Sequence, residues 1–223
     1  TFTSRDPMFE KYFWMSPYAY CANNPVKYVD PDGCEKLIFF NTKKPNYINY
    51  RQWKKDLEQR NANIRLEQFA KNYKDHDDVI HLFAHGNSQG VDLAEKGYKN
   101  TAFELDLFLV NNSTTYQKNI KENKTSLLIM HSCETGDGEN SIAQQLSKTA
   151  DDYLLVIAPS KTTSPDGNRE KVNKKGSWNV YYKGEIVGKY KGDIDFQKQL
   201  EGKNIQNVIR HWTNKYKEKY VND

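Results

Sequence analysis

Short apolar runs alternate with amphipathic stretches along most of the chain. Uninterrupted apolar runs are typical of buried strands, and they occur at residues 36–40, 79–85, 126–133 and 153–159. Helical spacing predicts helices at residues 50–59, 101–109 and 141–150, whereas 64–73 is ambiguous between strand and helix. Continuous apolar strands separated by helices indicate a sheet covered on both faces. We therefore expect an α/β fold, a three-layer sandwich with a mostly parallel central sheet.

The C-terminal part predicts two further elements. Residues 178–190 have strand character on both sides of Lys183-Gly184, which predicts a β-hairpin. Beyond it, five apolar residues share one helical face: Ile205, Val208, Ile209, Trp212 and Tyr216. We expect this last helix to pack on the sheet.

Composition narrows the class of protein. The 223 residues can form one sizeable domain, and an aromatic content of 13% is too high for a disordered chain. The net charge of +4 comes mainly from lysines spread along the chain. Such a distribution is usually a solvated surface, so we do not expect nucleic-acid binding.

Cysteine content and hydropathy argue against a disulfide-stabilised protein and against a membrane-spanning one. The three cysteines, Cys21, Cys34 and Cys133, are too few for a disulfide framework, and a Cys21–Cys34 pair would leave Cys133 free. The apolar runs are too short to cross a bilayer, and the start of the chain lacks a signal-peptide pattern. Because residue 1 is threonine, we expect the sequence to be a fragment of a longer chain.

Two of the predicted strands end in side chains that can carry chemistry. His85 ends one strand and Cys133 ends another. If these strands are neighbours, a base and a thiol emerge at the same edge of the sheet, where open parallel sheets bind ligands. A cysteine nucleophile needs such a base because the thiolate is the attacking species. The two residues lie 48 positions apart, close to the roughly 50 of the caspase arrangement.

Glycines follow both candidates. Gly86 comes directly after His85, and Gly136 and Gly138 come shortly after Cys133. Glycine allows backbone N–H groups to approach an oxyanion closely. His131 is a competing base, since strand alternation puts it on the same side as Cys133, but it lies inside its strand rather than at the tip.

A resemblance to the caspase-like cysteine peptidases, the group of clostripain, gingipain and CHAT, is carried by VIHLFAHGNSQG, SLLIMHSCETGDGENSIAQQL and YLLVIAPS in that order. The CHAT form is the most similar, with one strand ending in His-Gly and a later one in a Ser-Cys-Glu-Thr-Gly type of sequence. The likeness covers about residues 37–160. It implies His85 as general base, Cys133 as nucleophile, and the N–H groups of Gly86 and Cys133 as oxyanion donors. We expect neither a cofactor nor a metal.

The first segment has a different character. Residues 1–33 are rich in aromatic residues, Asn and Pro, with N-P, D-P and D-G turn signals. SPYAYCANNPVKYVDPDG resembles the end of the core domain of Bacteroides-type Rhs-repeat proteins, including the D-P-x-G motif at Asp30 and Asp32. In that family the core forms a shell around a variable C-terminal toxin and often cuts itself beside the motif. The resemblance implies a core remnant at 1–33 and a toxin domain at 34–223.

These resemblances together predict a cysteine endopeptidase that acts as a secreted Rhs-type toxin in bacterial competition. Its expected partners are a protein substrate, a cognate immunity protein and the Rhs core shell of the parent chain. A free thiol suits action in the target-cell cytoplasm. Loops near the strand ends are expected to select the substrate, with Asp166 or Glu170 binding a basic side chain and Trp178 forming a wall of the groove.

Two alternatives remain open. Residues 86–90 read G-N-S-Q-G, the nucleophile-elbow pattern of serine esterases and lipases, with Ser88 as nucleophile and His211 late enough to complete the triad. An elbow requires a helix directly after the serine, and residues 91–100 are a poor helix start. The other alternative is a non-peptidase toxin that acts through its lysine-rich surface.

Overall fold

The computed structural model describes residues 35–43, 50–73, 76, 78–166, 169–173 and 176–221. The predictions for residues 1–33, including Asp30 and Asp32, lie outside the described residues, as do those for Cys21 and Cys34. The described strands are β1 Glu35–Phe39, β2 Val79–Asn87, β3 Gly90–Asp92, β4 Tyr98–Lys99, β5 Ser126–His131, β6 Leu154–Pro159, β7 Thr163–Asp166, β8 Arg169–Val172, β9 Ser177–Tyr182 and β10 Glu185–Lys191. The helices are α1 Tyr50–Asn72, α2 Ala102–Asn112, α3 Thr114–Lys121, α4 Ile142–Ala150, α5 Phe196–Leu200 and α6 Ile205–Tyr220, with 3₁₀ turns η2 Ala94–Lys96 and η3 Asp151–Tyr153.

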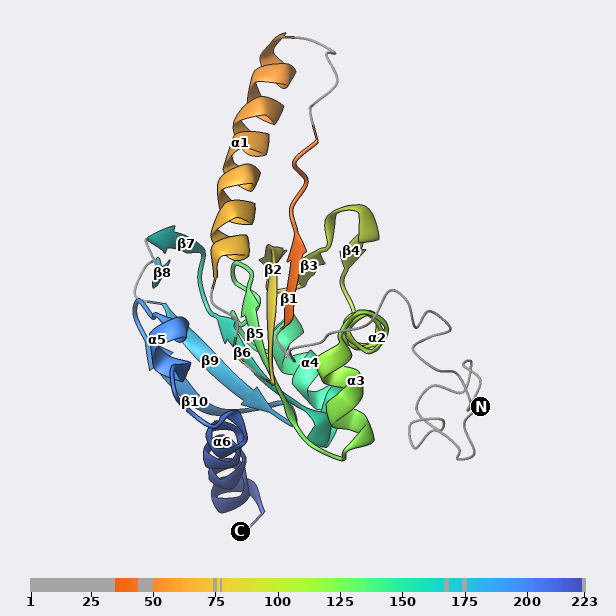
Figure 1. The fold of residues 1–223 in the computed structure, drawn as a ribbon, viewed down its shortest axis with the longest axis vertical. Helices are drawn as coiled ribbons and strands as arrows, with labels where there is room; N and C mark the ends of the chain where they lie inside the picture. Colours follow the sequence, from red (N-terminus) through yellow and green to blue (C-terminus); the bar gives the residue numbers. More distant parts are fainter. Residues whose placement is uncertain are drawn as a thin grey trace.

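An α/β architecture with a mixed eight-stranded sheet organises the described part of the chain (Figure 1). The order is β10-β9-β6-β5-β2-β3-β4, and β1 also pairs with β2. The strands β1, β2, β5 and β6 are mutually parallel, whereas β3, β4, β9 and β10 join by antiparallel pairings. The expectation of a mostly parallel sheet is therefore wrong for the sheet as a whole. Short turns connect β2 to β3 and β9 to β10, and such turns permit only antiparallel neighbours.

Each face of the sheet carries its own hydrophobic core, which confirms the expected helices on both faces. The first core packs α2, α3 and α4 on residues such as Leu82 and Leu128. The second packs the end of α1 together with α5 and α6 on residues such as Phe83 and Ile129. Alternating side chains of one strand thus enter different cores. The central strands β2, β5 and β6 are buried on both faces, which explains why they read as continuous apolar runs.

Local signals account for several helix ends. Thr101 caps α2 as expected, because its hydroxyl accepts from the Glu104 N–H at 3.2 Å and donates to the Glu104 carboxylate at 3.1 Å. The ambiguous segment 64–73 belongs to the single long helix α1 through Asn72. The helix α3 was not expected from the sequence. Ser113 separates it from α2 by ending one helix and capping the next through Tyr116 N–H.

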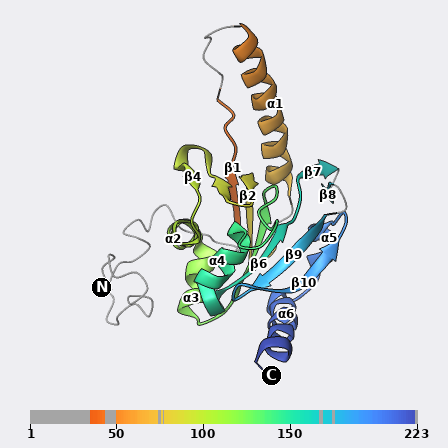
Figure 2. The ribbon, with the colours of Figure 1, turned by 180° about the vertical axis from the view of Figure 1, so that it is seen from behind.

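The predicted C-terminal elements are present. The strands β9 and β10 form a hairpin whose turn residues Lys183 and Gly184 have φ angles of 52° and 82°, the left-handed pair that a two-residue hairpin turn requires. The apolar face of α6 packs in the second core. Figure 2 shows α1 projecting past one end of the sheet and α6 past the other. Within the described residues, none of the helices combines the length and apolar character of a membrane span.

Candidate active site

The register of two neighbouring parallel strands brings His85 and Cys133 to the same level of the sheet. The strand β2 pairs with β5, and the last matched residues are Phe83 and His131. Their rings stack with centroids 4.1 Å apart and an interplanar angle of 7°, so both side chains lie on the same face. His85 and Cys133 each come two residues later. The condition set by the sequence, that these two strands are neighbours, is therefore met.

Close packing at Gly86 holds the two strand ends together. A Cβ at this position would lie 2.8 Å from Thr135 Cγ2 and 3.1 Å from Ser132 Cβ. These distances are too short for any larger residue to fit without displacement. The absence of a side chain therefore lets the backbone after His85 pack against the side chains of Ser132 and Thr135, which flank Cys133.

His85 is half-buried, and its ring is held by two neighbours. Its Nε2 lies 2.8 Å from Oδ1 of Asn63, in the second half of α1. The ring of Phe40 packs edge-on against it, with centroids 5.3 Å apart. Burial lowers the pKa of His85 below its ordinary value, while the negative charge of Asp92 opposes that shift. The neutral imidazole, which can accept a proton, is favoured as a result.

Sequence reasoning missed Asn63. This side chain is 4% exposed inside a long helix, although asparagine is unfavourable in helix interiors because it competes for backbone hydrogen bonds. An asparagine at such a position is itself a signal that the side chain has a tertiary partner. Its partner, His85, could not be identified from helical spacing alone.

The sulfur of Cys133 lies against the first residue of β7. The backbone N–H of Thr163 points to Sγ at 3.4 Å, and Sγ in turn lies 3.7 Å from the Thr163 carbonyl oxygen. The half-buried thiol is free of disulfide bonding. It makes no hydrogen bond with His85, whose own bond goes to Asn63. The structure thus brings the two candidates to neighbouring strand ends and gives each a different immediate partner.

His131 lies in the second core, away from the open edge. Its Nδ1 is 2.5 Å from Oε2 of Glu170, and its Nε2 is 2.9 Å from Nδ1 of His81. Both ring nitrogens are therefore engaged with buried groups, so His131 is not placed to serve as the base. The described residues contain no cluster of three or more His, Cys, Asp or Glu that could hold a metal ion.

Two expected substrate-binding side chains are in the interior. Glu170 is 4% exposed and paired with His131, so it cannot select a basic side chain at the surface. Trp178 is fully buried and packs on Phe196, so it cannot form a groove wall. Both expectations were wrong: Glu170 was taken for a surface loop position but lies in β8, and Trp178 lies in the predicted hairpin with its side chain turned into the second core. The side chain of Asp166 lies outside the described residues.

Ser88 occupies the tight turn between β2 and β3 rather than a strand-to-helix elbow. The chain continues from it into β3 and the 3₁₀ turn η2, as the weak helix character of 91–100 predicted. His211 lies on α6, which is on the far side of the sheet from this turn (Figure 1). These positions do not match the nucleophile-elbow geometry.

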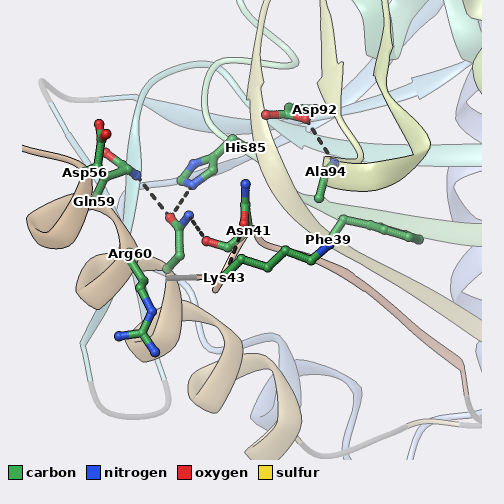
Figure 3. A pocket seen from close by; sticks show the side chains of 10 residues that line it. Phe39, Asn41, Lys43, Asp56, Gln59, Arg60, His85, Asp92 and Ala94 are labelled. Carbon is green, nitrogen blue, oxygen red and sulfur yellow. Dashed lines mark hydrogen bonds between the residues drawn. The ribbon is translucent and has the colours of Figure 1, made fainter. Parts of the chain in front are cut away.

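A pocket of about 490 Å³ lies beside His85 (Figure 3). It is lined by the middle of α1, the end of β1 with the residues that follow it, Asp92 of β3 and the start of η2. Its charged lining residues are of both signs, namely Lys43, Asp56, Arg60 and Asp92. His85 can therefore be reached from a polar cavity, as a residue acting on a substrate must be.

Comparison with known proteins adds a family without an assigned activity. The family model described as "Domain of unknown function (DUF8616)" matches residues 53–180, a range that includes Asn63, His85, Cys133 and Thr163. No curated protein and no solved structure matches the chain significantly.

Proposed function

The chain belongs to the DUF8616 family, and we propose that it is a cysteine peptidase of caspase-like architecture, with His85 as general base and Cys133 as nucleophile. The observation that carries this proposal is the parallel register of β2 and β5, from which His85 and Cys133 follow at the same level. The contact of Gly86 with Ser132 and Thr135 supports it further.

The proposed reaction is acyl transfer to water. His85 takes the proton of the Cys133 thiol, and the thiolate attacks the carbonyl carbon of a peptide bond to form a tetrahedral oxyanion. The backbone N–H groups of Gly86 and Cys133 are the proposed donors to that oxygen. His85 then gives its proton to the leaving amine as the C–N bond breaks. Water, deprotonated by His85, hydrolyses the thioester and releases the acid and the free thiol.

The contact between Cys133 Sγ and the Thr163 backbone must break before the proposed reaction can begin. Sγ has to leave the Thr163 backbone and turn towards the His85 ring, because general-base catalysis needs a donor–acceptor distance near 3 Å. Substrate binding beside Thr163 would supply the force for this rearrangement, as hydrogen bonds in free enzymes often tighten only with substrate.

A diverse peptide library with mass-spectrometric detection of new termini tests the activity. Wild-type protein is expected to cleave peptides, and Cys133→Ala should abolish cleavage. His85→Ala should lower the cleavage rate about 10²–10⁴-fold. Ser88→Ala serves as the matched control at the neighbouring turn and should keep the wild-type rate. Cleavage retained by Cys133→Ala, or no cleavage by wild type, contradicts the proposal, and loss confined to Ser88→Ala favours a serine hydrolase.

We also propose that this activity serves an Rhs-type toxin, secreted or delivered to a neighbouring cell and restrained by an immunity protein in the producer. The support is the likeness of SPYAYCANNPVKYVDPDG to the end of an Rhs core. Expression of residues 34–223 in the cytoplasm of a bacterium without immunity should stop growth, and Cys133→Ala should abolish the effect. Equal toxicity of the two forms would point to the lysine-rich surface instead.

A further inference from the structure

The buried amide of Asn63 is held in one orientation by its neighbours. Its Nδ2 donates to the carbonyl oxygen of Asn41 at 2.8 Å, and its Oδ1 accepts from Nε2 of Gln59 at 3.0 Å (Figure 3). A backbone carbonyl can only accept, so the amide atom that faces Asn41 must be the nitrogen. The atom that faces His85 is therefore the oxygen, and the two other bonds oppose an exchange of the two atoms.

This orientation decides which nitrogen of His85 carries the proton. The Oδ1 of Asn63 can only accept, so Nε2 of His85, at 2.8 Å, must be the donor. In a neutral imidazole only one nitrogen is protonated. The lone pair is then on Nδ1, which is free to take a proton from another group.

Two further contacts restrict the ring itself. The ring of Phe40 packs edge-on against one side of it, and the backbone of His85 is paired with Asp92 of β3. Rotation about the Cβ–Cγ bond by half a turn would place the carbon Cε1 where Nε2 now lies and so break the bond to Asn63. The tautomer and the ring orientation thus depend on the same hydrogen bond.

We propose that Asn63 is a positioning residue that fixes His85 as its Nε2–H tautomer and so presents Nδ1 as the base for Cys133. The role rests on the proposed peptidase function. Asn63 touches neither the thiol nor the substrate carbonyl in this scheme. It acts through His85, as the third member of a nucleophile–base–orienter arrangement.

The tautomer is tested directly by two-bond ¹H–¹⁵N correlation spectra of the imidazole ring in the full chain, with His85→Ala to assign the signal. Wild-type protein should show the Nε2–H form above the pKa of the ring. Asn63→Ala should give nitrogen shifts averaged between the two tautomers. Asn63→Asp keeps the accepting oxygen, so it should preserve Nε2–H and raise the pKa of His85 through its charge. An Nδ1–H tautomer in wild type, or no change in Asn63→Ala, overturns the inference whatever the protein's activity.

The functional consequence is tested by the pH dependence of Cys133 alkylation with iodoacetamide, read at the Cys133 peptide by mass spectrometry. In wild type, the rate at pH 6 should depend on His85, because its imidazole takes the thiol proton when Sγ turns towards it, and His85→Ala should lower that rate. Asn63→Ala should lower the ratio of the alkylation rate at pH 6 to that at pH 9 by about tenfold. This is less than the full effect of a positioned base, because the imidazole is still present. The matched control is Asn112→Ala on α2, whose amide bonds the Phe108 carbonyl, and it should leave the profile unchanged.

Failure of the peptidase proposal and failure of the positioning role give different experimental results. A wild-type alkylation rate at pH 6 that His85→Ala leaves unchanged contradicts the peptidase proposal and, with it, the role of Asn63. A rate that depends on His85 but is unchanged in Asn63→Ala contradicts the positioning role alone. A merely structural role predicts that Asn63→Ala and Asn112→Ala both reduce stability while the relative rate at pH 6 is unchanged.

Discussion

His131 on β5 donates through Nδ1 to the Glu170 carboxylate on β8, with 2.5 Å between Nδ1 and Oε2 and both side chains at most 5% exposed. This bond joins the central sheet to the separate two-stranded sheet of β7 and β8. The residue that contacts the Cys133 sulfur, Thr163, is in β7. The buried pair therefore anchors the small sheet beside the candidate nucleophile.

Removal of the Glu170 carboxylate should destabilise the fold. Glu170→Ala leaves the His131 N–H buried without its acceptor, and breaking a buried pair in this way costs about 3–5 kcal/mol. Glu170→Gln should lose less, because its amide oxygen can still accept from His131 Nδ1. Urea unfolding of the three proteins measures both values. Equal stability of Glu170→Ala and wild type would show that the bond contributes nothing net.

His81 should make the fold sensitive to acid. The bond between Nδ1 of His81 and Nε2 of His131 places His81 beside the buried His131–Glu170 pair. Full burial is the main cause that lowers the pKa of His81 well below 6.5, and the charges of His131 and His76 act in the same direction. The unfolded chain binds a proton below about pH 6.5 that the folded chain excludes, so stability should fall as pH decreases, by at most about 1.4 kcal/mol per pH unit from this group.

His81→Asn tests this contribution, since the asparagine amide can keep a hydrogen bond near the position of Nδ1 and does not titrate. The free energy of unfolding, measured by urea titration from pH 7.5 to pH 5, should decrease less steeply for the variant. The slope is the relevant quantity, because any constant loss of packing affects all pH values alike. Parallel curves for variant and wild type would contradict the assignment.

Gly86→Ala should separate the two strand ends. The new methyl group would lie 2.8 Å from Thr135 Cγ2 and 3.1 Å from Ser132 Cβ, and overpacking of this kind costs about 1–3 kcal/mol. Thr135→Ser removes the nearer methyl group and keeps the hydroxyl that bonds the Ser132 carbonyl. The double variant should therefore recover part of the lost stability and of the peptide cleavage. Additive effects of the two substitutions in thermal unfolding would argue against a direct clash.

Asp92 should control the charge state of His85. Its carboxylate raises the pKa of the His85 ring against the larger effect of burial. Asp92→Asn removes the charge while its amide oxygen can still accept from the Ala94 N–H, as Asp92 Oδ1 does at 2.9 Å. NMR titration of the His85 ring should then give a lower pKa than in wild type. A raised or unchanged pKa would mean that the charge does not act on the ring.

Local sequence patterns predicted the elements whose structure depends mainly on residues that are close in sequence. The buried strands have apolar side chains on both faces, and the Thr101 cap and the Lys183-Gly184 turn depend on neighbours in sequence. The direction of the outer strands was harder to predict, because β9 pairs with β6 through a tertiary contact. The pair β7–β8 was missed for a similar reason, since its sequence reads as a polar loop and gains its anchor from His131.

The candidate site likewise contains residues that local patterns identified and residues that they did not. His85 and Cys133 were identifiable because each follows an apolar run, whereas the pairing of their strands was a condition that the sequence left open. Asn63 and Thr163 were not, since they meet their partners across 22 and 30 residues of sequence respectively. Side-chain hydrogen bonds over such separations depend on the angle at which a helix or hairpin packs. The hydrophobic periodicity of a sequence does not indicate that angle.

The separate small sheet has a consequence for the order in which the molecule opens. The strands β2, β5 and β6 are enclosed by both cores and should be among the slowest to exchange their amide hydrogens. The strand β7 pairs only with β8 among the described residues, and its Ser164 and Pro165 are exposed. Local fluctuation of β7 can therefore uncover the Cys133 sulfur at a smaller free-energy cost than global unfolding, while the strand ends that present His85 remain intact.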